Sequence, residues 1–477
     1  MDVSQNGKVL FIIHDLYQDD NYFPSGVGYL AAVLKKNGSS VEIYSQDVFH
    51  YSNEELASFL RENRFDLIGL GFLAARFKET ILDLCNVINK NKKSAWLVLG
   101  GQGPSPIPEF VLNRTKADIV AIGEAEETIV DLLKCKLETG DLSKIKGIAY
   151  RDRDHIFINE RRKPIRNLDS IPFPQWDLFP MEEYSSCLNF YSMDKNDKAL
   201  DIITSRGCIN ACNFCYRMEK GFRFRSVKNV IQEIIELNEK YGISYFSMHD
   251  ELFTYPKKKI FEFADALERN DIKIKYDCQV RVDTFDDEVA ACLKSSGCQM
   301  ANFGFESMDQ NVLDLMKKNT KVEDNTNAMN TALKYHLGAG LNFIWGNIGD
   351  TEESLKKDVS FIKKFNTYNH LRTIRPVTPF PGSELYNDAI SRGLLSGPDD
   401  FFEKFKNSDL MTVNFTEIPD ETFYQLLFNA NRDLILDHYS HTSGDMNQAK
   451  VIIDDFYNLY FLGKTKFRGA RHYIKKG

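Results

Sequence analysis

Short apolar runs alternate with amphipathic segments over the first 140 residues. Residues 9–13 form a continuous apolar run, as a strand buried on both faces does, and the pattern of residues 26–38 is helical. The alternation continues, with further strands expected at 41–44, 67–70, 96–99 and 119–122 and helices at 54–61, 78–88 and 126–136. Strands that alternate with helices predict an α/β fold with a doubly wound, Rossmann-like parallel sheet.

A second series of strands and helices follows further along the chain. Its strands are expected at 199–204, 243–248, 273–280, 300–305, 339–344 and 371–377, with helices between them, and helices alone at 401–405, 421–435 and 448–462. Six repeats instead of eight predict a partial, open-sided barrel. The expected organisation is a doubly wound domain at 1–140, a connector at 141–195, a partial (βα)6 barrel at 196–398 and a mostly helical region at 399–477.

Composition and charge narrow the class of protein. A chain of 477 residues is too long for one ordinary core, and 43% hydrophobic with 27% charged residues is typical of a globular protein. No apolar stretch approaches the ~20 residues that span a bilayer, and residues 1–6 lack a signal-peptide pattern, which predicts a cytoplasmic protein without a membrane span. A net charge of −8 argues against nucleic acid as a partner, although residues 464–476 are locally basic.

Three of the nine cysteines lie within eight residues, directly after the first strand of the second series. Cys208, Cys212 and Cys215 have the spacing C-x3-C-x2-C. Soft thiolates select zinc, copper(I) or iron–sulfur clusters. A closed zinc site needs a fourth ligand, for which the sequence nearby offers no second pair, so the spacing favours an iron–sulfur cluster with one open iron. The other six cysteines are expected to be small buried side chains, since an odd number in a cytoplasmic chain does not indicate disulfides.

Glycines and polar residues follow the expected strands at the ends where ligands bind in such folds. In the first series, Gly100-Gly101-Gln102 and Ser105 follow strand four, and residues 123–128 follow strand five. Glycine lets a bulky ligand approach the backbone, and hydroxyls such as those of Ser105 and Thr128 hydrogen-bond its polar edge. The alternative is that these glycines are ordinary turn residues.

The cysteine loop, with Phe214 before its last cysteine, resembles the signature of the radical S-adenosylmethionine (SAM) enzymes. This resemblance implies a [4Fe-4S] cluster on Cys208, Cys212 and Cys215, which are then the catalytic residues, and an open iron that chelates SAM. It also implies SAM contacts from the ends of the barrel strands: Phe214, Asp250, Glu251, Arg281, Glu306, Ser307 and Pro379. Two features depart from the family pattern: residues 347–350 read Asn-Ile-Gly-Asp, and Glu251 replaces an aspartate.

The N-terminal region resembles the cobalamin-binding domain that is fused to one large class of radical SAM enzymes, the class B methyltransferase-like family. The likeness consists of the start of the first helix, the Gly-Gly turn after strand four and the Gly-Glu-x-Glu-x-Thr segment after strand five. The cobalamin contacts it implies are Gly26, Gly28, Gly100, Gly101, Gln102, Ser105, Gly123, Glu124, Glu126 and Thr128. The Asp-x-His-x-x-Gly motif is missing, so we expect no histidine on the lower face of cobalt.

These resemblances imply an enzyme that takes an electron from a reductase such as flavodoxin or ferredoxin and cleaves SAM to a 5′-deoxyadenosyl radical. With cobalamin it would methylate an unactivated carbon of a small metabolite, natural-product intermediate or peptide. One alternative is an enzyme of the same architecture that cyclises, rearranges or oxidises its substrate without methyl transfer. Another is a non-catalytic metal or cobalamin sensor that keeps the fold.

Overall fold

The computed structural model describes residues 7–16, 21–73, 77–188, 190, 192–442 and 445–464. The N-terminal residues 1–6 and nearly all of the basic segment at 464–476, on which the sequence carries expectations, lie outside the described residues. The chain divides into two compact units. The first unit comprises residues 1–188, 195–207 and 217–245, and the second comprises 189–194, 208–216 and 246–477.

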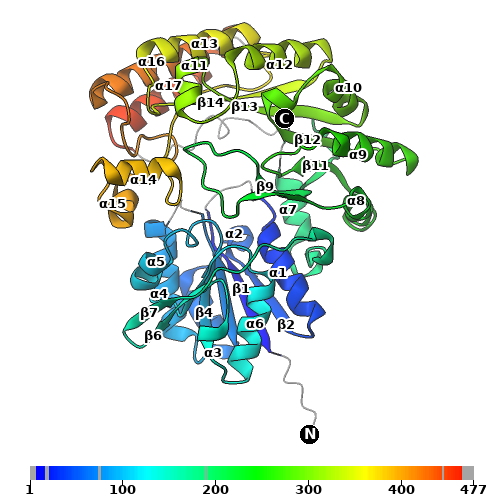
Figure 1. Ribbon diagram of the computed structural model, residues 1–477, viewed down its shortest axis with the longest axis vertical. Coiled ribbons are helices and arrows are strands. Elements are labelled where there is room, and N and C mark those ends of the chain that lie inside the picture. The colour runs from blue at the N-terminus through cyan, green and yellow to red at the C-terminus, as the bar shows by residue number, and fades with distance from the viewer. Residues whose placement is uncertain are drawn as a thin grey trace. The chain divides into compact units, whose positions relative to one another are not determined.

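The first unit contains a seven-stranded sheet in the order β2-β1-β3-β4-β5-β6-β7. Strands β1 to β5 are parallel, whereas β6 and β7 join antiparallel at one edge (Figure 1). The prediction of a doubly wound parallel sheet is confirmed, and the sheet gains two strands from residues beyond 140. The strands are β1 (Lys8–Ile13), β2 (Ser40–Ser45), β3 (Leu67–Gly71), β4 (Trp96–Gly100), β5 (Ile119–Ala121), β6 (Ile148–Asp152) and β7 (His155–Ile158).

Helices of the first unit lie between these strands and after them. Several begin at recognisable caps; the helix after Ser52 has a capping box in which Ser52 and Glu55 satisfy each other's backbone N–H groups. The helices are α1 (Ser25–Lys36), α2 (Gln46–Phe49), α3 (Asn53–Glu62), η1 (Phe77–Ile81), α4 (Leu82–Asn91), α5 (Pro108–Thr115), α6 (Glu126–Leu137), η2 (Leu142–Lys144), α7 (Met181–Cys187) and α8 (Val227–Tyr241).

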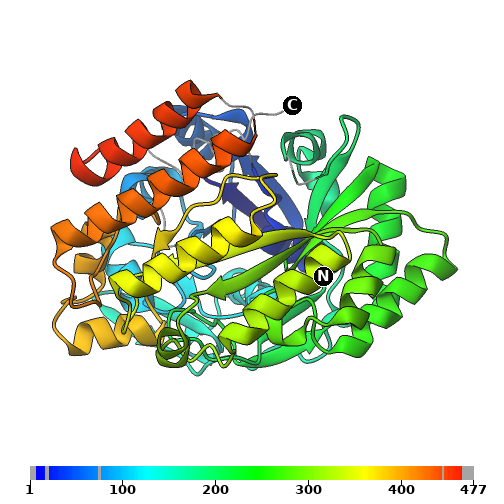
Figure 2. The same cartoon turned by 90° about the horizontal axis from the view of Figure 1, so that it is seen from above.

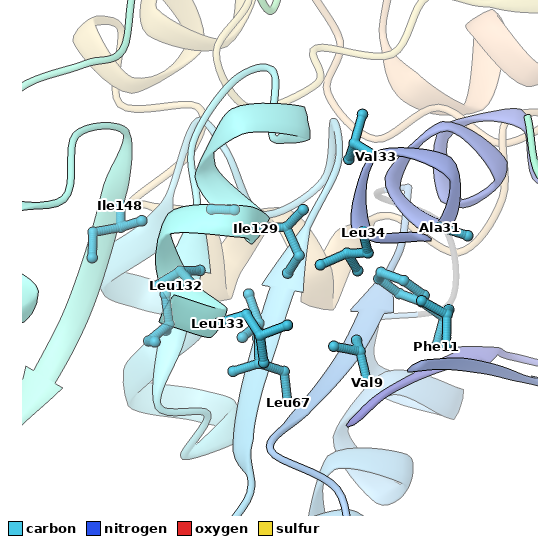
Figure 3. Close-up of a cluster of buried hydrophobic side chains, with 14 of the residues drawn as sticks. Val9, Phe11, Ala31, Val33, Leu34, Leu67, Ile129, Leu132, Leu133 and Ile148 are labelled. Atoms are coloured by element: carbon cyan, nitrogen blue, oxygen red, sulfur yellow. The ribbon is translucent and has the colours of Figure 1, made fainter. Parts of the chain in front are cut away.

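The core of the first unit lies between its sheet and the helices α1 and α6. Val9 and Phe11 alternate along β1 with residues of the other face, and they meet Leu34 of α1 and Ile129 of α6 (Figure 3). All four side chains are almost fully buried. Because these strands are buried by helices on both faces, the edge at their carboxyl ends is left for ligands.

The second sheet has six strands in the order β15-β14-β13-β12-β11-β8. The pairs β12–β13, β13–β14 and β14–β15 are parallel, as expected for a partial barrel. A separate two-stranded ribbon, β9 with β10, flanks the cysteine loop. The strands are β8 (Lys198–Ile202), β9 (Ser205–Cys208), β10 (Gly221–Phe224), β11 (Ile243–Met248), β12 (Lys275–Val280), β13 (Cys298–Glu306), β14 (Gly338–Trp345) and β15 (Arg375–Pro376).

The helices of the second unit follow its strands, and two long helices come last. Figure 2 shows the last two, α16 and α17, running side by side, where the rings of Phe428 and Phe461 meet at 5.5 Å. Phe423 of α16 stacks on Trp345 at the end of β14, with 4.2 Å between ring centroids. The helices are α9 (Lys257–Arg269), η5 (Val282–Thr284), α10 (Asp287–Ser295), α11 (Gln310–Leu315), α12 (Val322–Lys334), α13 (Glu352–Phe365), α14 (Glu384–Ser391), α15 (Pro398–Lys404), α16 (Asp420–His441) and α17 (Met446–Phe461).

Within the expected connector, the segment 167–178 around Pro172 and Pro174 is mostly irregular and holds two short 3₁₀ turns, η3 (Leu168–Ser170) and η4 (Trp176–Leu178). Pro174 lies against α1, where the Gln175 N–H donates to the carbonyl of Gly28 at 3.1 Å. No helix among the described residues is long and apolar enough to cross a membrane.

Candidate active site

The cysteine loop of the second unit is held by backbone and amide hydrogen bonds. The Asn213 N–H donates to the carbonyl of Met316 at 2.9 Å, and its carbonyl accepts from the Leu385 N–H at 2.8 Å. The side chains of Asn213 and Asn347 exchange two hydrogen bonds, at 3.1 and 3.0 Å. Asn347 belongs to the segment that departs from the family pattern, so this departure supplies an anchor for the loop that carries the cysteines.

Two of the three cysteine thiols are linked by a hydrogen bond. The hydrogen bond from Cys215, helped by the charges of Lys318 and Arg281, lowers the pKa of Cys212 to about 6, against the effects of burial and of the Glu306 charge. The same hydrogen bond raises the pKa of Cys215. Cys208 is half-buried, and its sulfur accepts from the backbone and side-chain nitrogens of Asn210 at 3.5 and 3.6 Å. The loop thus offers thiolate character in positively charged surroundings, which suits soft, electron-rich metal clusters.

No three or more His, Cys, Asp or Glu side chains among the described residues are gathered around the position of a single ion. A [4Fe-4S] cluster takes cysteine thiolates on separate irons and does not require three sulfurs around one point. The donor set of three cysteines, with cationic side chains near Cys212, therefore fits a cluster better than a single zinc ion.

A buried ion pair lies beside this loop. Lys318 Nζ donates to Glu306 Oε1 at 2.7 Å, and the two side chains are 8% and 11% exposed. Glu306 has a φ of +64°, in the left-handed region, where the register between β13 and β14 shifts. A Cβ on Gly304 would lie 2.5 Å from Glu306 Oε1, so the glycine makes room for the pair. Strained backbone of this kind is concentrated at functional sites.

Arg281 contributes a second buried cation. Its Nε and Nη2 each donate to the carboxylate of Asp283 at 2.9 Å, and Nη2 also donates to the carbonyl of Lys318 at 2.9 Å. Burial alone would lower the pKa of Arg281, but the Asp283 carboxylate and the thiols of Cys212 and Cys208 raise it. Arg281 therefore remains charged beside the cysteines.

The other residues expected to contact SAM differ in accessibility. Asp250 and Pro379 are buried, Phe214 is half-buried and Glu251 is exposed. Ser307 is fully buried; its hydroxyl accepts from the Asp309 N–H at 3.2 Å and lies 3.4 Å from a carboxylate oxygen of Asp358. Through these hydrogen bonds Ser307 stabilises the end of β13. Its contact with SAM stays a prediction.

Amide side chains line one face of the second sheet. Gln279 and Asn302 are partners in the β12–β13 register, and Gly304 and Asn342 are partners in the β13–β14 register. Gln279 and Asn342 are exposed and Asn302 is half-buried. The opposite face packs against helices through rings such as Phe303 and is buried. The accessible side chains of this face are therefore amide donors and acceptors, and the buried carboxylate of Asp277 lies behind them, 3.4 Å from Asn302 Nδ2.

Some of the residues expected to contact cobalamin lie at exposed positions of the first unit, at the start of α1 and in the turn after β4. Gly26, Gly101 and Gln102 are exposed, and a Cβ on Gly26 would meet no atom within 4 Å. Gly101 has a φ of +97° and so needs to be glycine, while Gly100 has only the Cβ of Ala121 near it, at 3.9 Å. The turn after β4 leaves backbone accessible to a large ligand.

The remaining expected contacts are occupied by protein partners. A Cβ on Gly28 would meet Pro174 at 2.8 Å, so this glycine allows the connector to approach α1. The Ser105 hydroxyl donates to the carbonyl of Gly101 at 2.7 Å and accepts from the Gly123 N–H at 3.3 Å. Thr128 accepts from Arg162 Nε at 3.0 Å.

The two glutamates after β5 are ion-paired. Arg206 Nη2 donates to Glu126 at 2.5 Å, and Arg223 binds Glu124 with both Nη atoms, at 2.7 and 3.0 Å. Burial alone would raise the pKa of Glu124, but the hydrogen bond from Arg223 and the charge of Arg206 hold it below its ordinary value. Contacts from Glu124 and Glu126 to cobalamin stay predictions.

The sequence alone did not indicate a role for Lys318, Asn213, Arg206 or Arg223. Lys318 follows another lysine and resembles a surface residue in the sequence, although it is buried. Arg206 precedes the first cysteine by two residues, and this closeness was the one available signal for it.

Comparison with known proteins identifies two families in the chain. The Radical SAM superfamily model matches residues 202–362, and the B12 binding domain model matches residues 19–133. The chain is a radical SAM enzyme with an N-terminal cobalamin-binding domain. The cofactors of this radical SAM enzyme are a [4Fe-4S] cluster, SAM and cobalamin, as the sequence predicts.

Known relatives include methyltransferases and a cyclase. An uncharacterized methyltransferase of Pyrococcus horikoshii is 28% identical over 378 residues, covering 78% of this chain and 79% of the relative. The anaerobic magnesium-protoporphyrin IX monomethyl ester cyclase of Rubrivivax gelatinosus is 26% identical over 80% of this chain and 70% of its own length. The radical SAM methyltransferase TsrM of Kitasatospora setae, solved with cobalamin and a [4Fe-4S] cluster, shares the fold at a TM-score of 0.67 and 16% identity, covering 81% of this chain and 75% of TsrM.

Proposed function

We propose that this radical SAM enzyme transfers a methyl group to an unactivated carbon of a small metabolite, natural-product intermediate or peptide. The observation that carries the proposal is the open glycine turn after β4, where exposed Gly101 and Gln102 leave room for a corrin in the same chain as the cysteine loop. Bound cobalamin would supply a transferable methyl group, and a site for it therefore favours methyl transfer over other radical reactions.

The Glu306–Lys318 pair is suited to the charged end of SAM. The amino acid moiety of SAM carries one ammonium and one carboxylate, so Glu306 would bind the first and Lys318 the second after their mutual contact opens. Cys208, Cys212 and Cys215 would hold the cluster, which would pass on an electron from a reductase and offer the open iron needed for SAM cleavage. Arg281 and Lys318 offset the negative charge of the thiolates.

The amide-lined face of the second sheet supports a polar substrate without a strong charge. Gln279, Asn302 and Asn342 each carry one acceptor and two donors, although Asn342 already donates to the carbonyl of Phe303 at 2.9 Å and Asn302 to Asp277 Oδ1 at 3.4 Å. A neutral amide, hydroxyl or heterocyclic nitrogen would satisfy these groups. A bare charge would lose hydration and find no opposite charge among these three amides.

The alternative is cyclisation, rearrangement or oxidation without methyl transfer. It is favoured by the similarity to the protoporphyrin ester cyclase, which is close to that of the P. horikoshii methyltransferase in identity and in the share of the chain covered. A difference of two percentage points in identity does not separate these reactions.

Isotope labelling distinguishes the two functions. Anaerobically reconstituted protein would be reduced and incubated with a small-molecule extract and SAM that is labelled in its methyl group. Methyl transfer requires one SAM as methyl donor and one as radical source, so we expect S-adenosylhomocysteine, 5′-deoxyadenosine and a labelled product in equal amounts. Formation of 5′-deoxyadenosine with no labelled product would support the alternative and contradict our proposal. Cys212→Ala serves as the inactive control.

A further inference from the structure

The cysteine loop emerges from a ribbon whose two strands approach each other closely. Strand β9 ends at Cys208, strand β10 begins at Gly221, and Cys212 and Cys215 lie in the segment between them. Gly207, with a φ of +86°, lets the strands approach, since a Cβ there would lie 2.3 Å from the carbonyl oxygen of Gly221. The position of β9 and β10 therefore sets where both ends of the loop leave the first unit.

One carboxylate, that of Glu124 after β5, binds both strands of this ribbon. From β10, Arg223 donates through Nη2 to Oε1 at 2.7 Å and through Nη1 to Oε2 at 3.0 Å. From β9, Arg206 Nη1 lies 3.3 Å from Oε1. Arg223 also donates to the carbonyl of Ile165 at 2.7 Å, and the Ile165 N–H donates to Oε2 of Glu124 at 2.9 Å.

These contacts use the whole hydrogen-bonding capacity of Glu124. A carboxylate has about four lone-pair sites, and here each oxygen has two nitrogen partners. The side chain is 10% exposed. Glu124 consequently has no acceptor site left for a side-chain amide of cobalamin while these pairs persist.

Arg206 has two further partners, which fix its orientation. Its Nη2 donates to Glu126 Oε1 at 2.5 Å, and its guanidinium carbon lies 5.4 Å from the ring centroid of Tyr29. Two arginines and two glutamates balance in charge in a mostly buried setting, so removal of one member leaves another without its partner.

We propose that Glu124 is a positioning residue for the iron–sulfur cluster: it ties β9 and β10 to the end of β5 and thereby fixes the two ends of the cysteine loop. The Gly-Glu-x-Glu segment then orients the cluster ligands through Arg206 and Arg223, and Glu124 does not contact the corrin. Groups that hold metal ligands in their orientation commonly affect metal affinity.

The test compares Glu124→Gln with Glu127→Gln in full-length protein reconstituted with iron, sulfide and hydroxocobalamin. Glu127, three residues after Glu124, is 58% exposed and is paired with Arg162 instead of the ribbon, which makes it a matched control. The readouts are iron and sulfide content, the electron paramagnetic resonance spectrum of the reduced cluster, the rate of iron release to a chelator, and corrin absorbance after desalting.

We expect Glu124→Gln to release iron about 10-fold faster than the wild type and to show an altered cluster spectrum, with corrin retention unchanged. Glu127→Gln should match the wild type in all readouts. Loss of corrin with an intact cluster would overturn the proposal and make Glu124 a cobalamin contact. Iron release at the wild-type rate would also overturn it.

If Glu124→Gln does not fold, Arg223→Lys provides the same test, because lysine keeps the charge but cannot make both bonds to Glu124. The same four readouts and the same outcomes apply to it. None of these measurements depends on methyl transfer, so failure of this proposal and failure of the proposed methyltransferase function are distinguishable.

Discussion

The expected ligand sites at the carboxyl ends of the two sheets differ in exposure and in charge. In the first unit the turn after β4 is rich in glycine, its residues 100–105 are uncharged, and Gly101 and Gln102 are exposed. In the second unit the end of β13 carries a buried ion pair, Glu306 with Lys318. This difference is the one expected if the first site takes a large corrin that the backbone can approach closely and the second takes the compact, charged SAM.

The largest effect is expected from removing a cluster ligand in the second unit. Cys212→Ala should abolish the cluster absorption and 5′-deoxyadenosine formation, because a cubane held by two cysteines is not retained. Corrin retention by the first unit should be unchanged. Cys292→Ala, at a half-buried cysteine outside the loop, is the control and should keep its iron. Full iron content in Cys212→Ala would contradict the assignment of the cluster to this loop.

The buried charge pair of the second unit should be costly to break. Lys318→Met leaves Glu306 buried without its partner, which we expect to lower the free energy of unfolding by about 3 kcal/mol and to weaken SAM binding. Urea unfolding and equilibrium dialysis with labelled SAM measure these effects. Lys317→Met is the matched control, since its pair with Glu384 is half-exposed, and it should cost less than about 1 kcal/mol. Equal losses in both variants would remove the contrast between the sites.

The first unit also contains a buried acid, away from its open turn. Burial raises the pKa of Asp47 to about 6, although the hydrogen bond from Tyr184, at 2.7 Å, lowers it in part. A raised pKa means that this group stabilises the fold fully below about pH 4 and that this stability is lost as the pH rises to about 6, by about 3 kcal/mol at most.

Asp47→Asn should therefore become more stable relative to the wild type between pH 4.5 and 6.5, as measured by urea unfolding at each pH. Asp83→Asn, at an exposed position on α4, should show no such trend. A constant difference between Asp47→Asn and the wild type over this range would show that Asp47 is not protonated on folding.

The smallest effects are expected from the two glycines at the start of α1. Gly28→Ala should lower the free energy of unfolding by about 1–3 kcal/mol, because its Cβ would meet Pro174 at 2.8 Å and the ring of Phe23 at 3.1 Å. Gly26→Ala meets no atom within 4 Å and should be neutral or slightly stabilising, but should reduce corrin retention if Gly26 borders the corrin. Thermal unfolding and corrin absorbance measure the two effects separately. Destabilisation by Gly26→Ala would contradict the open space beside this position of α1.

The alternation of strands and helices in both sheets could be read from the sequence because it depends on local periodicity. Strands such as β1 and β4 are nearly continuous apolar runs, and their bounds agree closely with those expected. Strand β15 is shorter than expected, only Arg375–Pro376, and β6 and β7 were missed: both are short, and β7 is largely exposed at the edge of the sheet.

The cysteine spacing and the glycine turns were likewise determined by the sequence, since a C-x3-C-x2-C loop and a Gly-Gly turn are local features. Which charged residues meet was decided only by the tertiary structure. Glu124 lies 82 and 99 positions from Arg206 and Arg223, and Asn213 lies 134 positions from Asn347. Pairing over such separations depends on strand order and on which face each side chain occupies, and a single sequence carries no periodic signal for either.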